Sequence, residues 1–460
     1  MREMKKKCEN YFRKSLQITA AFFILTIYFT QSVHAQFTDM KKILAQVTDN
    51  YEGLETIYKD LHMNPELSGM EKNTSEKIKT ELIKYGYEVK DKIGGFGVVG
   101  ILRNGPGKTI MFRTDMDALP IEEKTGLQYA SKTKSKDKNG KEVSVMHACG
   151  HDMHMTNFLG TAQALANFKS EWSGTVIFVA QPAEENGTGA KAMLDAGLFA
   201  KYPVPDYILA VHLSAELESG KIGVIQGPAF AGADNMEITV YGQGGHGGFP
   251  HKTIDPVLLS AELVIALQTL ISRELDVATP AVISVGAING GFATNIIPDE
   301  VVLKVTMRTY SKDVREFLLK RIEQITAGLA SAKGLPKEKF PKIDVYKSYI
   351  PPVYNDPELT ADIEKHIINA IGKSSVIKVM PIMASEDFSI YGNNEVKIPS
   401  TLIWLGGVPE SVIKKYQTIP NQMPGLHSPY FYPDISNTIK TGIRATTSAI
   451  LGMLKVEPQN

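Results

Sequence analysis

Short β-rich runs alternate with helical stretches along most of this 460-residue chain, and this alternation constrains the fold more than any other feature. Flanking turn residues and length separate the two kinds of run. We expect strands at Thr109–Thr114, Thr175–Gln181, Tyr207–His212 and Thr401–Leu405. We expect helices at Thr74–Tyr85, Met155–Phe168, Pro357–Ala370 and Ser436–Leu454. Strands separated by helices predict an α/β fold with a mostly parallel sheet flanked by helices.

Residues 234–342 follow a different pattern. A strand, a helix, two strands and a second helix follow one another, with a final strand near Ile343–Tyr346. The expected elements are Met236–Tyr241, Asp255–Arg273, Ala281–Ile288, Val301–Thr309 and Lys312–Ala332. This β-α-β-β-α-β order predicts an α+β ferredoxin-like domain. We expect it to be inserted between the two parts of the larger domain, residues 36–233 and 343–460.

Residues 1–35 have the layout of a secretory signal peptide. Basic residues precede the apolar run Ile18–Phe29, and Val33–Ala35 offers a cleavage point. A run of 12 residues is too short to span a bilayer comfortably, so a retained anchor is the weaker alternative. No later stretch is long and apolar enough to cross a membrane. We therefore expect an exported protein, periplasmic or extracellular, without a stable membrane anchor.

Without this leader the chain has 44 basic and 48 acidic residues, a net charge of −4. Neither that balance nor any basic stripe with interleaved aromatic residues suggests a nucleic-acid partner. Cys8 lies in the leader, so Cys149 is the single cysteine of the expected mature chain. Packing rather than disulfides must therefore stabilise it.

Cys149 lies in the segment His147–His154, together with three histidines and Asp152. Thiolate, imidazole and carboxylate are the ligand types that zinc and other first-row metals select. Cys149 and His151 lie two residues apart in a glycine-containing loop and could reach a single ion. A buried thiol beside solvated histidines and a Cys–His nucleophilic pair are the alternatives.

Carboxylates follow two of the expected strands, at the end where open α/β sheets place their sites. Asp115 and Asp117 are two residues apart, so in extended backbone both face the same way. Glu184 and Glu185 follow the strand Thr175–Gln181, and adjacent acids are costly to bury unpaired. A metal removes that cost if one carboxylate binds it while the other takes a proton from metal-bound water. A solvated charged loop is the alternative.

His212 closes the strand Tyr207–His212, and His427 lies in a turn-rich segment far along the chain. Each would be unremarkable by itself. With Cys149, His151 and Glu185, however, they supply more ligands than one tetrahedral zinc takes. Two metals that share ligands fit this set better.

Several motifs occur in order along the chain: Leu61–Ser68, Phe112–Pro120, Met146–Asp152, Gln181–Glu185 and Ser385–Phe388. In these motifs the chain resembles the amidohydrolase branch of the aminoacylase/carboxypeptidase metallopeptidase superfamily. That branch includes hippurate hydrolases, auxin–amino-acid conjugate hydrolases and N-acyl-diaminopimelate deacetylases. The match covers nearly all of the expected mature chain.

The resemblance implies that the larger domain is catalytic and binds two divalent metal ions, with zinc, manganese, nickel or cobalt as candidates. It assigns Glu184 as general base and proton shuttle. Asp117 is interpreted as a residue that orients the metal site. The implied metal ligands are Cys149, His151, Glu185, His212 and His427.

The inserted domain contains the glycine-rich run Gly242–His251, which lacks the Lys-Ser/Thr of a nucleotide phosphate loop. The resemblance implies that this domain mediates homodimerisation and that His246 reaches an active site to stabilise the oxyanion. It also implies that Asn295 and Arg308 bind the substrate carboxylate or support the oxyanion. A strand-end cap and a surface charge are the alternatives for these two residues. The chain departs from the usual pattern at Gly247 and Gly248, where alanines are more common.

We therefore expect an exported metal-dependent hydrolase that cleaves the amide bond of a small N-acyl amino acid or peptide-like conjugate. A dipeptidase or carboxypeptidase of the same superfamily is one alternative. A catalytically silent relative that binds metal or peptide is another. The intact Glu184–Glu185 pair argues against the silent relative, because binding alone needs no unligated base.

Overall fold

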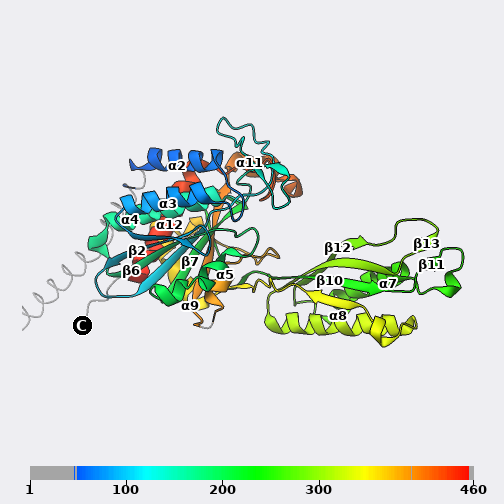
Figure 1. Cartoon of the computed structure of the whole chain (residues 1–460). Coiled ribbons are helices and arrows are strands. Elements are labelled where there is room, and N and C mark those ends of the chain that lie inside the picture. Colours follow the sequence, from blue (N-terminus) through cyan, green and yellow to red (C-terminus); the bar gives the residue numbers. More distant parts are fainter. Residues whose placement is uncertain (1–45, 47–48, 395, 455–460) are drawn as a thin grey trace, which may run out of the picture.

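The computed structural model describes residue 46, residues 49–394 and residues 396–454. The expected signal peptide, with Cys8, lies outside the described residues. Two lobes are evident in Figure 1. The larger lobe is a sheet layered between helices, and the narrower lobe projects from it as a sheet with two long helices.

The larger lobe is built on an eight-stranded sheet in the order β1-β2-β6-β3-β7-β18-β8-β17. The four central strands β6, β3, β7 and β18 are parallel to one another, whereas β2 pairs antiparallel with β6 and β8 pairs antiparallel with β18. The expected α/β fold with a mostly parallel sheet is thus confirmed. The strands are β1 Glu88–Ile93, β2 Gly97–Asn104, β3 Thr109–Asp115, β6 Gly174–Gln181, β7 Tyr207–Glu218, β8 Ile222–Val224, β17 Val376–Lys378 and β18 Ser400–Val408.

Both faces of this sheet are covered, because alternate residues of each strand enter opposite cores. On β6, for example, Phe178 packs in one apolar cluster and Val179 in the other. One face is covered by α2 Tyr51–Met63, α3 Lys72–Lys84, α4 His151–Asn167, α9 Pro357–Ile371 and α12 Ile435–Leu454. The other is covered by α5 Gly189–Asp195, α6 Leu198–Lys201 and α10 Ser389–Gly392. Fully buried side chains of this kind stabilise the fold by roughly 1.5–3 kcal/mol each.

Two element boundaries near the expected site are corrected. Helix α4 begins at His151 rather than near Met155, because Gly150 adopts a left-handed conformation (φ 83°) that ends the preceding loop. His151 therefore lies on the first helical turn and not in a loop. Strand β7 continues past His212 to Glu218, because β18 pairs with it on both sides of that histidine.

The projecting lobe is a four-stranded antiparallel sheet in the order β12-β14-β10-β15. Its elements are β10 Gly232–Tyr241, α7 Pro256–Thr269, β12 Ala281–Asn289, β14 Glu300–Thr309, α8 Lys312–Ala332 and β15 Lys342–Val345. This is the expected β-α-β-β-α-β order, but the expected range 234–342 omits the first two residues of β10 and residues 343–345 of β15. A short pair, β11 Gly245–His246 with β13 Ile296–Ile297, lies at the tip farthest from the larger lobe (Figure 1).

Helix α7 continues through one π-helical turn, so a 19-residue helix runs from Pro256 to Glu274. By length and composition alone it is apolar enough to cross a membrane, so the expectation that no such stretch follows the leader was wrong. Its composition has a structural reason. Leu259, Leu263 and Leu267 pack on the lobe's sheet, while Val257, Leu258 and Ile265 are exposed on the opposite side. One such helix is only a weak indication of a membrane span.

Candidate active site

A cavity of about 530 Å³ opens where the carboxyl ends of the central strands meet the start of the projecting lobe. Open α/β sheets place their sites at this end. Six of the expected site residues line the cavity: Cys149, Glu184, Glu185, His212, Arg308 and His427. Its apolar wall includes Phe230, Ile350, Ile382, Trp404 and Leu426.

Cys149, His151 and His212 converge on one point beneath this cavity, with donor atoms within 4.8 Å of one another. Cys149 Sγ lies 3.8 Å from Nε2 of His212. A side chain at Gly150 would meet Leu213 at 2.4 Å, so glycine is needed between the cysteine and the first helical residue. The tight turn brings the thiol and the imidazole to the same side.

Both buried histidines present the same ring nitrogen to the cavity. Nδ1 of His151 lies 2.8 Å from the carbonyl oxygen of Asp117, and Nδ1 of His212 lies 2.8 Å from that of Leu213. A carbonyl oxygen only accepts, so each Nδ1 carries the proton. In the neutral imidazole each Nε2 is then the unprotonated nitrogen, which is the form that ligates a metal.

Glu184 and Glu185 enter the site from a turn after β6. Ala183 precedes them with a left-handed backbone (φ 52°), which a non-glycine residue rarely adopts. One carboxylate oxygen of each acid lies 3.9 Å from Nε2 of His151. Glu185 Oε1 also lies 3.5 Å from Nε2 of His427, which reaches the site from the loop before α12.

The donor atoms fit a bound cation. Within the described part of the chain, Nε2 of His151 and Oε1 of Glu185 are buried without a hydrogen-bond partner, which is costly for a polar atom. Burial raises the pKa of Glu185 to about 7, so its ionised form needs a compensating positive charge. Cys149 belongs both to the group with His151 and His212 and to a group with Glu185 and His427. The five expected ligands would therefore hold metal as two groups of donors, and Cys149 belongs to both.

Burial also weighs against Cys149 as a nucleophile. It raises the pKa of the Cys149 thiol well above its ordinary value. The thiolate is the reactive form, so a free thiol in this environment is inert at neutral pH. A metal ion reverses that preference, because a coordinating thiol is deprotonated.

Asp117 lies behind His151 and connects it to the acid pair. Its Oδ1 is 3.3 Å from Nδ1 of His151, and its Oδ2 accepts hydrogen bonds from Ser68 Oγ (2.6 Å) and the backbone N–H of Glu185 (3.0 Å). Asp115 lies on the other side, where Nδ1 of His154 bonds its Oδ1 at 2.7 Å. Asp115 Oδ2 also lies 3.9 Å from Nε2 of His151, so the two aspartates lie on opposite sides of this histidine ring.

A buried charge cluster below Glu184 was missed by the sequence analysis. The guanidinium of Arg113, fully buried on β3, lies 2.6 Å from Asp115, 2.8 Å from Glu386 and 3.2 Å from Asp387. Burial and then Glu386 raise the pKa of Glu184 well above its ordinary value, which favours a carboxylate that accepts a proton. An arginine within the apolar strand Thr109–Asp115 was the available signal, because a buried arginine requires carboxylate partners.

The structure also locates the motif Leu61–Ser68, whose position relative to the site the sequence did not predict. His62 Nδ1 lies 2.6 Å from Asp152 and its Nε2 lies 3.2 Å from Glu123. His147 is buried nearby, with neither ring nitrogen hydrogen-bonded within the described residues. The motif therefore packs behind the metal-ligand segment rather than in the cavity.

The remaining expected residues divide between the lobes. Arg308, on β14, lines the cavity half-buried, and its Nη1 is buried without a hydrogen-bond partner in the described structure. His246 and Asn295 are not brought to this cavity. They lie together at the tip of the projecting lobe, where the N–H of Gly247 bonds the carbonyl oxygen of Asn295 at 2.8 Å.

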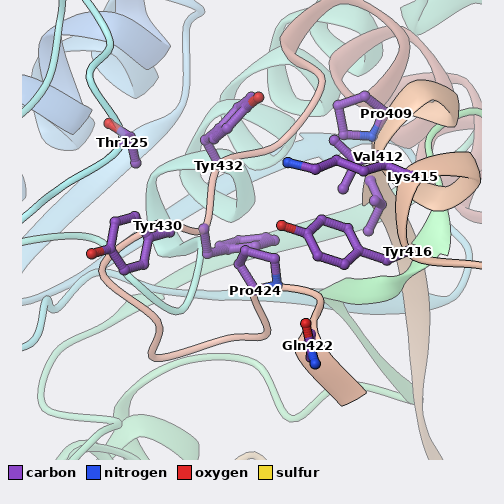
Figure 2. A pocket seen from close by; sticks show the side chains of 11 residues that line it. Thr125, Pro409, Val412, Lys415, Tyr416, Gln422, Pro424, Tyr430 and Tyr432 are labelled. Atoms are coloured by element: carbon purple, nitrogen blue, oxygen red, sulfur yellow. The ribbon is translucent and has the colours of Figure 1, made fainter. Parts of the chain in front are cut away.

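A second cavity, of about 430 Å³, lies on the other side of the loop that carries His427. Figure 2 shows Lys415 and Tyr416 reaching into it from α11 Glu410–Tyr416, opposite Tyr430 and Tyr432. Its lining contains no carboxylate, cysteine or histidine. The metal-ligand chemistry is therefore confined to the first cavity of the two.

Comparison with known proteins agrees with this geometry. Residues 111–450 match the model of peptidase family M20/M25/M40. The thermostable carboxypeptidase 1 of Saccharolobus solfataricus is 36% identical over 371 residues, 80% of this chain and 89% of that protein. The hippurate hydrolase of Campylobacter jejuni is 36% identical over 352 residues, 76% of this chain and 87% of that protein. A crystal structure of the Bacillus subtilis YXEP protein, described as a dinuclear metal-binding peptidase, superposes with a TM-score of 0.69 at 28% identity, covering 89% of this chain and all of that one.

The fold and the site together define a metal-binding hydrolase of amide bonds. The chain belongs to peptidase family M20/M25/M40.

Proposed function

We propose that this protein is a metal-dependent amidohydrolase that cleaves N-acyl amino acids or related small conjugates. The observation that carries this proposal is the convergence of an acid pair with cysteine and histidine donors in one cavity, with Arg308 on its wall. The relatives include both a hippurate hydrolase and a carboxypeptidase, which supports hydrolysis of amide bonds.

Two divalent ions are proposed, with zinc, manganese, nickel and cobalt as candidates. The five expected ligands fall in two of the candidate donor groups, which share Cys149, and this supports two adjacent ions more than one. Bound there, the ions would lower the pKa of a water molecule and polarise the scissile carbonyl. Metal analysis of the purified protein identifies the native ion and its stoichiometry.

Glu184 is proposed as the general base. It lies beside the metal-donor side chains, and burial and then the Glu386 carboxylate raise its pKa. Such a carboxylate can take a proton from the attacking water and return it to the leaving nitrogen. Arg308 is proposed to bind the substrate carboxylate, because its unpartnered Nη1 offers a buried donor.

The test is a pair of substitutions at the acid pair. Glu184→Gln should keep metal at the wild-type stoichiometry while turnover of N-acetyl- and N-benzoyl-amino acids falls by about 100-fold or more. Glu185→Gln, the matched control one residue away, should lose metal as well. Near-normal turnover in Glu184→Gln would refute the assignment of the base.

Carboxypeptidase or dipeptidase activity is the second candidate, and the Saccharolobus solfataricus relative favours it. The relative rates of hydrolysis of the two substrate classes distinguish the two activities. Faster hydrolysis of free dipeptides than of N-acyl amino acids would establish the second candidate. No turnover of either class by metal-loaded protein would instead indicate a silent binding protein.

We further propose a homodimer formed through the projecting lobe. Helix α7 exposes Val257, Leu258 and Ile265 along one side, and strand β12 is an edge of its sheet. His246 and Asn295 do not line the cavity of their own chain, and the β11–β13 pair at which they lie is at the tip farthest from the larger lobe (Figure 1), so they are available to a second copy. Sedimentation at several protein concentrations tests the dimer, and Ile265→Glu should shift it to monomer.

Export through residues 1–35 is proposed from the leader sequence. Intact mass of protein recovered from outside the cytoplasm of the producing cell would show whether cleavage follows Ala35.

A further inference from the structure

The segment that links α2 to α3 makes contacts with the site that the proposed reaction does not yet use. Ser68 bonds Asp117, and Glu71 is fully buried at the start of α3. Glu71 is an acid that no ligand assignment or proton transfer requires, so its burial needs another explanation.

The Glu71 carboxylate bonds two backbone amides. Its Oε1 accepts hydrogen bonds from the N–H of Gly69 at 2.7 Å and from the N–H of Ala183 at 2.8 Å. Ala183 is 112 positions away in the chain and directly precedes Glu184. Glu71 thus connects the helical layer to the turn that carries both acids.

That turn depends on an unfavourable backbone conformation. Ala183 has a left-handed φ of 52°, which costs a non-glycine residue roughly 1–2 kcal/mol. Its carbonyl oxygen accepts from the N–H groups of Thr188 (3.2 Å) and Gly189 (3.1 Å), so the turn closes around this residue. Such a conformation persists only where surrounding contacts hold it.

We propose that Glu71 is a positioning residue for the Glu184–Glu185 pair: its hydrogen bond to the Ala183 amide holds the strained turn that directs both acids into the cavity. The role in turnover rests on the proposed hydrolase function. The role in holding the turn does not, because it concerns the backbone of residues 183–189 alone.

Glu66 provides a matched control in the same segment. Its carboxylate also bonds backbone amides, those of Asn73 (3.1 Å) and Thr74 (2.8 Å), but these belong to α3 and not to the acid turn. It also accepts from the side chains of Asn73 and Thr74, so removing either carboxylate removes hydrogen bonds from the same region. Of the two carboxylates, that of Glu71 bonds the acid turn, and the backbone bond from Ala118 to the Glu66 carbonyl is kept in Glu66→Ala.

The turn itself is tested by hydrogen exchange, which needs no substrate. In Glu71→Ala, exchange of the amides at 183–189 should accelerate at least tenfold, while Glu66→Ala should accelerate exchange only around Asn73 and Thr74. Unchanged exchange at 183–189 in Glu71→Ala would overturn the proposal whatever the enzyme hydrolyses.

Turnover is then compared on the N-acyl amino acid that the wild type hydrolyses fastest. Glu71→Ala should lower kcat by about 10- to 100-fold with KM changed less than threefold, because misplacement of a catalytic group acts mainly on the chemical step. Glu71→Gln, which keeps an acceptor oxygen, should restore most of the loss. Glu66→Ala should retain wild-type kcat.

A double variant tests the strain directly. Glycine adopts a left-handed backbone without penalty, so Ala183→Gly in the Glu71→Ala background should recover at least threefold in kcat. No recovery, or a kcat in Glu71→Ala equal to that of Glu66→Ala, would contradict the proposal.

If Glu71→Ala does not fold, Glu71→Asp serves in its place, because it retains the carboxyl group and shortens the reach to Ala183. If the wild type hydrolyses no substrate, the proposed function is refuted. The hydrogen-exchange result would then still show whether Glu71 holds the turn at residues 183–189.

Discussion

His151 donates from Nδ1 to the backbone carbonyl oxygen of Asp117, 2.8 Å away, and this bond fixes which ring nitrogen faces the cavity. The carboxylate of the same aspartate approaches that nitrogen to 3.3 Å and accepts the N–H of Glu185. Asp117 therefore holds a proposed histidine ligand and a proposed glutamate ligand in one arrangement.

Asp117→Ala should reduce metal affinity by about 10- to 100-fold, because the backbone bond to His151 remains while the support of the carboxylate is lost. Competition with a chromogenic chelator measures this change. Asp195→Ala, which removes an exposed carboxylate paired with Lys191, is the control and should bind metal as the wild type does. Equal affinities in the two variants would count against the orienting role of Asp117.

Cys149→Ser should lower metal content first and turnover as a consequence. A serine hydroxyl stays protonated where a metal-bound thiol does not, so it is a poorer ligand in a buried site. Metal content and kcat are measured together over a titration of added metal. Recovery of activity at high metal concentration supports a ligand, whereas full metal loading with no activity would support a nucleophile.

Arg113→Met should lower the free energy of unfolding by about 3–5 kcal/mol, because Asp115, Glu386 and Asp387 would remain buried without their counter-charge. Urea denaturation measures the change. Arg103→Met on strand β2 of the same sheet removes an exposed pair with Glu88 and should cost less than about 1 kcal/mol. A loss below 1 kcal/mol for Arg113→Met would show that the three carboxylates do not depend on Arg113 for their counter-charge.

The stability of the protein should depend on pH through His62. Burial lowers the pKa of His62, but hydrogen bonds to Asp152 and Glu123 outweigh it and raise that pKa from 6.5 to about 9. A raised pKa stabilises the fold fully below pH 6.5, and this contribution disappears as pH rises through 9. The raised pKa of His62 thus contributes about 3 kcal/mol to the free energy of unfolding, because one pKa unit corresponds to 1.36 kcal/mol.

The measurement is the difference in unfolding free energy between the wild type and His62→Gln at pH 6 to pH 9. That difference should shrink steadily over the range, since only the wild type contains the titrating pair. A difference that stays constant with pH would show that His62 is not charged in the folded state.

Sequence patterning predicted the elements better than their connections. The strand Thr109–Thr114 and the helix Lys312–Ala332 follow from local periodicity, and the structure contains both with at most one residue changed. Arg113 and Glu386 are 273 positions apart, so no local pattern could pair them. The left-handed backbone of Ala183 was equally invisible, because alanine does not signal it. Sequence also could not show that His246 lies at the far tip of one lobe, since that depends on how the lobes are joined.

The strand order of the larger lobe has a consequence for synthesis on the ribosome. Strand β18, at residues 400–408, lies between β7 and β8, whereas the projecting lobe has all four strands of its main sheet by Val345. The insert can therefore fold while the parallel sheet still exposes an open edge at β7, the kind of edge that promotes aggregation. His427 emerges later still, so the donor group that it forms with Cys149 and Glu185 is complete only after the inserted lobe and β18 have been synthesised.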